Sequence, residues 1–148
     1  MTRVRHSMVL PYTADEIYAV VSDVAAYADF LPGIISSEVW SKTDTSMEAR
    51  LVMGKGAIRQ SLITRSRLVA GELIEMSMLE GPFSRFSGRW TFEALQSGNE
   101  PACRVTIEAD YEFSSIMLNM TLGKLIQANT DKVIEAFNRR AARLYRNQ

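Results

Sequence analysis

The sequence has a single cysteine, Cys103, and a single histidine, His6, among its 148 residues. One cysteine excludes an intramolecular disulfide, and such scarcity is typical of cytoplasmic proteins. A zinc site needs three or four ligands, and a Ser-His-Asp triad would have to use His6 without any G-x-S-x-G motif in the chain. The sequence therefore predicts no metal site and no catalytic residue. We expect His6 on the apolar side of a strand and Cys103 as an inert buried thiol.

The chain also lacks long hydrophobic runs and an excess of charge of one sign. No stretch approaches the roughly 20 apolar residues of a membrane-spanning helix, and the N-terminal segment has no signal-peptide core. Lysine and arginine total 17, as do aspartate and glutamate. Zero net charge provides no global field that would attract DNA, which we exclude as a partner. We expect one domain over residues 1–148, cytoplasmic or peripheral at the inner membrane.

Local signals at the start of the chain predict one strand and two helical segments. Apolar and polar residues alternate in the first ten positions. Thr13 and Glu16 have the spacing of a capping box, which begins a helix, and Pro32-Gly33 is a turn signal that ends the next segment. These signals predict a strand over 3–10, a helix over 13–23 and a short second helix within 22–34.

The middle of the chain changes to a period of two, which is typical of half-buried strands. Turn residues interrupt the pattern, among them Gly54-Lys55-Gly56, which lacks the spacing of a phosphate-binding loop. The pattern predicts six strands over 35–42, 46–53, 58–68, 73–80, 86–94 and 103–113. In the last of them the residues from Arg104 to Glu112 at even positions are expected on the solvent-facing side.

The C-terminal segment has apolar residues spaced by three, four or seven positions from Leu118 to Leu144, which predicts one long amphipathic helix over about 115–146. Placed after six strands, such a helix can cover the apolar face of their sheet. The predicted fold class is therefore α+β. A curved antiparallel sheet of about seven strands wraps around the long C-terminal helix, and two short helices follow the first strand.

Seven short pieces of sequence, found in order along essentially the whole chain, carry a resemblance to a known family. They are Pro11-Tyr12-Thr13; Val21-Ser22-Asp23-Val24; Tyr27 with Phe30, Leu31 and Pro32; Gly81-Pro82-Phe83; Gly88 with Trp90 and Phe92; Glu112-Phe113; and Ala136-Phe137 with Arg140-Ala141. With these pieces the chain resembles the helix-grip fold of START-like (SRPBCC) lipid-transfer and polyketide-cyclase proteins. Within that superfamily it resembles the coenzyme Q-binding proteins, whose bacterial members are also named ribosome-association toxins.

The resemblance implies a non-catalytic protein with a hydrophobic cavity between sheet and long helix. Its ligand would be ubiquinone or a similar polyprenyl lipid, and its role that of a carrier or chaperone supporting respiratory electron transport. As an alternative, the resemblance implies a ribosome-association toxin that binds the large ribosomal subunit and inhibits subunit joining. A polyketide cyclase-like enzyme ranks third, because no carboxylate or histidine pattern indicates acid–base catalysis.

Residue types also favour an apolar cavity. Eight methionines are many for this length, and flexible methionine side chains suit a changeable apolar ligand, although plain core packing is an equal alternative. Asn129 and Tyr111 are candidates to bind a polar head group, although Asn129 could equally face solvent beside Asp131. The predicted ligand-binding residues are Tyr27, Phe30, Leu31, Met53, Met76, Met78, Trp90, Phe92, Tyr111, Met117, Met120, Asn129 and Phe137. Gly88, which lies between Phe86 and Trp90, predicts a bend or a close approach by the helix or the ligand.

Two strongly apolar segments are candidates for the mouth of the cavity and for transient membrane contact: 22–34, and 113–123, which has no charged residue. Packing of both segments into the core is the alternative. If they form a mouth, changing Phe30 or Met117 to aspartate should block lipid uptake with less effect on folding.

The C-terminal region offers a different kind of surface. Between Lys124 and Gln148 there are six basic and two acidic residues, a local net charge of +4. Such a patch, together with arginines on the strands, could contact ribosomal RNA or anionic lipid head groups. Glutamates share the solvent-facing side of the sheet, so a mixed, solvated surface is the alternative.

Overall fold

The computed structural model describes residues 2–98 and 100–145, except the side chains at 55, 96, 97, 125 and 127–131. The elements follow the predicted order, and strand ends differ from prediction by no more than three residues. They are β1 (Thr2–Leu10), α1 (Ala14–Ser22), η1 (Val24–Ala26), α2 (Tyr27–Phe30), β2 (Ile34–Lys42), β3 (Ser46–Lys55), β4 (Ile58–Val69), β5 (Leu73–Glu80), β6 (Phe83–Ser97), β7 (Glu100–Phe113) and α3 (Ile116–Tyr145).

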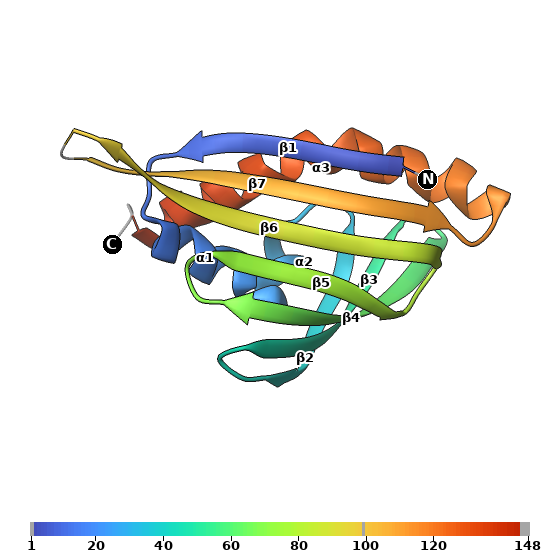
Figure 1. Cartoon of the computed structure of the whole chain (residues 1–148). Helices are drawn as coiled ribbons and strands as arrows, with labels where there is room; N and C mark the ends of the chain where they lie inside the picture. The colour runs from blue at the N-terminus through green and yellow to red at the C-terminus, as the bar shows by residue number, and fades with distance from the viewer. Residues whose placement is uncertain (1, 99, 146–148) are drawn as a thin grey trace.

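The strands form one antiparallel sheet in the order β1-β7-β6-β5-β4-β3-β2. From β2 to β7, each strand pairs with the strand that follows it in the sequence. The first strand, β1, pairs with the last, β7, at one edge of the sheet. Register shifts interrupt the pairing of β2 with β3, β4 with β5 and β6 with β7, and such irregularities bend strands. The sheet curves, and α3 runs along its inner face, as the predicted helix-grip fold requires (Figure 1).

Helix α1 begins with the predicted capping box. The backbone N–H of Glu16 donates to the Thr13 hydroxyl at 3.0 Å, and the N–H of Thr13 donates to the Glu16 carboxylate at 2.9 Å. Two N–H groups that the first turn leaves without helical partners are thereby satisfied. The inner side of the helix buries Ile17, Val20 and Val21, which fixes α1 against the sheet.

The segment after α1 is held by hydrogen bonds to its neighbours. The Ser37 hydroxyl of β2 donates to the Ala25 carbonyl and accepts from the Ala28 N–H, both at 3.1 Å. Gly33 ends the segment with a φ of 83°, and its carbonyl accepts from the Gly54 N–H at 3.0 Å. The apolar stretch that the sequence shows here therefore lies fixed between α3 and β2 rather than loose on the surface.

Buried apolar residues form two clusters along the inner face of the sheet. The larger cluster joins α1, the middle strands and the C-terminal half of α3, and it includes Trp90 and Phe137. The smaller cluster lies toward the start of α3 and contains Leu62, Phe83, Tyr111, Phe113 and Leu122. Cys103 is fully buried in the larger cluster, and burial raises the pKa of its thiol, as expected for an inert cysteine.

The outer face of the sheet carries arginines paired with carboxylates on neighbouring strands. The pairs are Arg3–Asp110, Arg5–Glu108, Arg65–Glu48, Arg67–Glu75, Arg89–Glu75 and Arg104–Glu93, at 2.7–3.5 Å. Hydrogen bonds from Arg67 and Arg89 lower the pKa of Glu75. This face is thus the mixed, solvated surface expected as the alternative to a basic patch.

Thr106 lies on the outer face of β7, as predicted, but it is not exposed to solvent. Thr106 is buried, with its hydroxyl 3.0 Å from that of Ser7. It lies between Ser7 of β1 and Thr91 of β6 in the register of the sheet, and these neighbours cover it.

Candidate functional site

A cavity of about 240 Å³ lies between the inner face of the sheet and α3. The wall contains residues of both buried clusters, so the cavity lies where the two clusters meet. The described wall is overwhelmingly apolar. It is formed by Val4, Tyr27, Leu31, Pro32, Gly33, Ile34, Leu51, Met53, Leu62, Thr64, Met76, Phe83, Phe86, Trp90, Ile107, Ala109, Tyr111, Leu122, Ile126, Val133 and Phe137.

Seven of the thirteen residues proposed from the sequence line this cavity. They are Tyr27, Leu31, Met53, Met76, Trp90, Tyr111 and Phe137. Gly88 explains how Met76 fits: a Cβ at this glycine would lie 2.7 Å from the Met76 terminal methyl. The close approach at Gly88 is therefore made by a side chain of the adjacent strand β5, and not by the helix as predicted. The side chain of Asn129 lies outside the described residues, so its predicted role as a head-group ligand stays a prediction.

Met117 and Met120 do not line the cavity, and their placement in its wall is wrong. Their side chains are 75% and 68% exposed, and that of Ile116 is 81% exposed. The inward side of this part of α3 is formed instead by Leu118 and Leu122, which are spaced by four. Residues 116, 117 and 120 share the opposite side of the helix, because helical neighbours are spaced by three and four. Met117 and Met120 are therefore not packed into the core, which was the alternative to a mouth for segment 113–123.

Phe30, Met78 and Phe92 also lie outside the described cavity wall. Phe92 faces inward but lies at the α1 end of the sheet, where its ring meets that of Tyr18 edge-on at 5.6 Å. Met78 packs against the smaller cluster. Phe30 lies on the outer side of Leu31, where the Arg140 guanidinium sits 5.3 Å from its ring centre. Alternation along a strand gives the face of the sheet but not the position along the cavity.

Phe137 is the centre of an aromatic cluster at one side of the cavity. Its ring lies 5.4 Å from those of Tyr27 and Phe30 and 5.3 Å from that of Trp90, in edge-to-face arrangements. The side chain is 1% exposed. These contacts tie α3 to the α2 segment and to β6, so the cluster sets the distance between helix and sheet on which the cavity depends.

Two tyrosine hydroxyls of the wall differ in their surroundings. The Tyr27 hydroxyl donates to the Val21 carbonyl, and burial followed by the charge of Asp23 raises its pKa. The Tyr111 hydroxyl is buried and has no hydrogen-bond partner among the described residues; burial raises its pKa as well. Both phenols are therefore neutral near pH 7. The described wall includes no carboxylate, imidazole or ammonium group.

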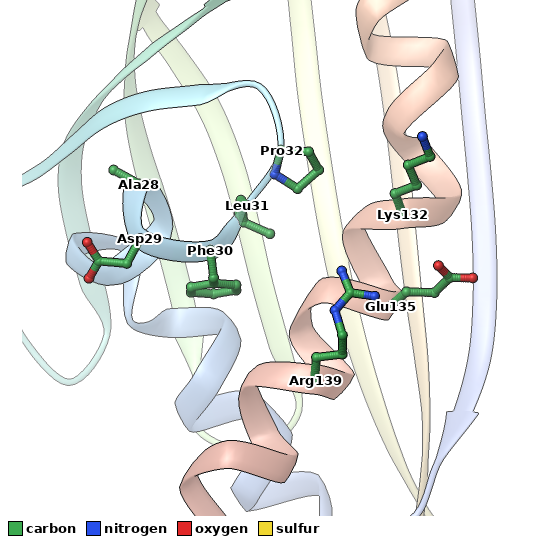
Figure 2. Close-up of a pocket in the computed structure, with 8 residues that line it drawn as sticks. All are labelled: Ala28, Asp29, Phe30, Leu31, Pro32, Lys132, Glu135 and Arg139. Atoms are coloured by element: carbon green, nitrogen blue, oxygen red, sulfur yellow. The ribbon is translucent and has the colours of Figure 1, made fainter.

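An outer cleft of about 530 Å³ lies beside the cavity, between the α2 segment and α3 (Figure 2). Charged side chains surround it: Asp29 from α2, and Lys132, Glu135 and Arg139 from α3 (Figure 2). Leu31 and Pro32 border both the cleft and the cavity, so these two residues are the partition between them.

Many of the wall residues that the sequence did not indicate come from the strands. Leu62 and Thr64 of β4 and Ala109 of β7 line the cavity and occupy inward positions of their strands. Alternation would have placed them on the inner face, but attention to methionine and aromatic residues left them out. Small side chains such as that of Ala109 matter here because they leave space.

The part of the chain that the structure describes contains no cluster of three or more histidine, cysteine, aspartate and glutamate residues placed to hold a metal ion. No helix within residues 2–98 and 100–145 is long and apolar enough to cross a membrane.

Comparison with known proteins places the chain in a family. Residues 10–138 match the family described as polyketide cyclase / dehydrase and lipid transport. The ribosome association toxin RatA of Pseudomonas aeruginosa is 35% identical over 144 residues, which cover 97% of this chain and 98% of that protein. The mitochondrial coenzyme Q-binding protein COQ10 of Dictyostelium discoideum is 25% identical, over 92% of this chain and 67% of that protein.

Solved structures agree with the fold. A START superfamily protein from Mycobacterium smegmatis aligns with a TM-score of 0.78 at 18% identity, over 96% of this chain and 98% of that one. The ZhuI aromatase/cyclase from Streptomyces sp. R1128 aligns with a TM-score of 0.75 at 20% identity, over 96% and 94%. The chain therefore belongs to the polyketide cyclase/dehydrase and lipid transport family and has its START-like fold, as the sequence resemblance predicted.

Proposed function

We propose that this protein binds a hydrophobic small molecule, ubiquinone or a similar polyprenyl lipid, in the cavity between the sheet and α3. It would carry the molecule without changing it chemically. The observation that carries this proposal is a cavity with an apolar described wall and one buried, neutral hydroxyl that has no partner among the described residues. An apolar space with a few polar groups is typical of small-molecule sites. The name of the Dictyostelium relative, a coenzyme Q-binding protein, supports the same ligand class.

The cavity volume limits how much of such a ligand fits. Apolar cavities of about 150 Å³ admit a benzene-sized molecule. A volume of about 240 Å³ therefore suits a substituted ring or one to two prenyl units, but not a long chain. Each five-carbon unit buries on the order of 100 Å², worth about 2.5 kcal/mol. The remainder of a polyprenyl chain must leave the cavity, and Leu31 and Pro32 separate the cavity from the outer cleft.

Organic extraction of the purified protein followed by mass spectrometry tests the proposal. A quinone or other polyprenyl lipid in near-stoichiometric amount would support it. Titration of the extracted protein with a short-tailed benzoquinone should then give saturable binding. An extract without lipid, combined with no binding of the added quinone, would reject the carrier function.

The described wall supports binding rather than catalysis. Cyclisation or dehydration of a substrate needs groups that accept and donate protons near the operating pH. The hydroxyls of Tyr27 and Tyr111 have raised pKa values and stay protonated, and the wall brings no carboxylate or imidazole to them. The likeness to an aromatase/cyclase is one of fold, at 20% identity.

The exposed apolar side chains at the start of α3 support a role in lipid uptake from a membrane. Ile116, Met117 and Met120 form a patch (the α3 tip), and Leu122, two residues after Met120, lines the cavity. The α3 tip lies beside the β5–β6 turn, since the Ser114 N–H donates to the Pro82 carbonyl at 2.9 Å. An apolar surface of this kind can insert between lipid head groups.

We expect Met117→Asp to slow quinone transfer from vesicles severalfold without unfolding the protein. The side chain is mostly exposed, so the free energy of unfolding should change by no more than about 0.5 kcal/mol. Stopped-flow transfer and urea denaturation measure the two effects. Unchanged transfer would exclude the α3 tip from uptake. Phe30→Asp is no longer an equivalent test, because Phe30 contacts Tyr27 and Phe137 and its loss should destabilise the fold.

A second candidate function is ribosome binding, supported by relatives that carry the name ribosome association toxin at 34–35% identity over nearly their full length. Its surface would be the outer side of α3, where Lys132, Arg139 and Arg143 are exposed. The ion pairs found within the described residues all join strands of the sheet and leave α3 uninvolved. Exposed cations of this kind can contact RNA phosphates.

If this second function holds, the protein should sediment with large ribosomal subunits, and added salt should release it. The double change Lys132→Glu and Arg139→Glu reverses two charges at the outer cleft and should abolish co-sedimentation. Arg3→Glu on the sheet is the matched control and should have little effect. Sedimentation that survives the double change would place the contact elsewhere.

A further inference from the structure

The Tyr111 hydroxyl is a buried polar group for which the protein itself provides no described partner. Tyr111 is 3% exposed and belongs to the cavity wall. Burying a hydroxyl without a hydrogen bond is unfavourable, so buried polar groups are nearly always paired. A hydroxyl that lies unpaired in a cavity wall can donate its hydrogen bond to a molecule bound there.

The neighbours of Tyr111 hold its ring but offer no acceptor. The rings of Phe83 and Phe113 meet it edge-on, with centres 5.6 Å and 5.7 Å away. The other tyrosine of the wall, Tyr27, already donates its hydroxyl to the Val21 carbonyl. Of these two phenols, Tyr111 is therefore the one available to a ligand.

We propose that Tyr111 donates a hydrogen bond to a carbonyl oxygen of the ligand, and that the ligand binds with its oxygen-bearing ring inside and its tail leading out. This inference rests on the proposed carrier function and deepens it by naming the polar contact and the orientation. It assigns the ligand class as a neutral ring carbonyl, of which a quinone head is one example.

Two observations favour this orientation over entry with the tail first. A volume of about 240 Å³ suits a substituted ring, whereas a polyprenyl tail would fill it with only one or two units. A tail in the cavity would also leave the Tyr111 hydroxyl against hydrocarbon, still unpaired. A carboxylate head is disfavoured, because the described wall holds no cation to neutralise it.

Burial raises the pKa of Tyr111, so the phenol keeps its proton and can donate at physiological pH. Its position on β7 adds rigidity, because the strand is paired on both sides, with β1 and with β6. A donor fixed in this way loses little entropy when a ligand binds.

The test compares Tyr111→Phe with the wild type, using a benzoquinone with a ten-carbon tail and decylbenzene, which has the same tail on a ring without oxygen. In calorimetric titrations the wild type should bind the quinone about tenfold more tightly than decylbenzene. In Tyr111→Phe the quinone should bind roughly five- to tenfold more weakly, while decylbenzene binding is unchanged. Equal quinone binding by both proteins would overturn the inference.

A second readout separates a ligand-binding hydroxyl from a structural one. Without ligand, Tyr111→Phe should melt at the wild-type temperature or higher, because the lost hydroxyl was unpaired. The matched control is Tyr145→Phe, whose hydroxyl donates to the Glu16 carbonyl at 3.1 Å. This control should lower the melting temperature and leave the preference for quinone intact.

The outcomes distinguish this inference from the function on which it rests. If the wild type binds neither probe, the carrier proposal itself fails. If it binds both probes but Tyr111→Phe keeps the preference for quinone, the orientation is wrong and the carrier proposal stands. A melting temperature lowered by Tyr111→Phe would mean that the hydroxyl has a protein partner, which also overturns the inference.

Discussion

Replacing Phe137 by alanine is expected to lower the free energy of unfolding by about 3–5 kcal/mol, the range for deleting a fully buried aromatic ring. Phe137 is 1% exposed and contacts the rings of Tyr27, Phe30 and Trp90. These partners come from α2 and β6, so the deletion loosens three elements at once. The new space would also join the existing cavity, and its shape would no longer be defined.

Urea denaturation followed by far-UV circular dichroism measures this loss. Tryptophan fluorescence is unsuitable as the only signal, because Trp90 touches the deleted ring. Phe86→Ala provides the matched control: Phe86 also lines the cavity, but it is only half-buried and its described ring contact is with Phe83. The control should lose clearly less stability. Equal losses would mean that the aromatic cluster does not hold α3 to the sheet as described.

The fold was predictable because its local signals agree with one another. Thr13 and Glu16 form the capping box that their spacing indicates, and Gly33 ends the α2 segment in the left-handed conformation that glycine favours. Alternation along β7 gave the two faces of the strand correctly, and Thr106 differs only in that Ser7 and Thr91 bury it on the outer face. The spacing of apolar residues that distinguishes a strand from a helix lies within a single short segment, so it can be read from one sequence.

The cavity was only half predictable, because its wall depends on which inward residues face one another across the molecule. Periodicity put Trp90 and Phe92 on the same face of β6, but only Trp90 reaches the cavity, while Phe92 lies beside Tyr18. At the start of α3 nearly every residue is uncharged, so the sequence left both an exposed mouth and a core position open for Met117, and the structure exposes it. Empty space is a property of the packing of several elements, and no single stretch of sequence records it.

The second large effect concerns ligand binding: Ala109→Leu should weaken quinone binding roughly fiftyfold or more. Ala109 lies on β7 in the cavity wall, paired with Gly88 of β6 and Val4 of β1. A leucine side chain at this position would occupy space that the ligand needs. Displacing about 100 Å² of buried ligand surface costs about 2.5 kcal/mol, which corresponds to a factor of this size.

Ala109→Leu should not destabilise the fold, so a loss of quinone binding could be assigned to the filled cavity and not to unfolding. Adding methylene groups to a tightly packed core destabilises a protein by about 1–3 kcal/mol, whereas filling an existing cavity does not. We therefore expect Ala109→Leu to unfold at the wild-type urea concentration or above it, while it loses the ligand. The matched control is Ala94→Leu, at an exposed position of β6, which should change neither property. If Ala109→Leu bound the quinone as the wild type does, the ligand would have to bind elsewhere. If it unfolded more easily, the space beside Ala109 would already be filled by the protein's own side chains, and a carrier needs that space open.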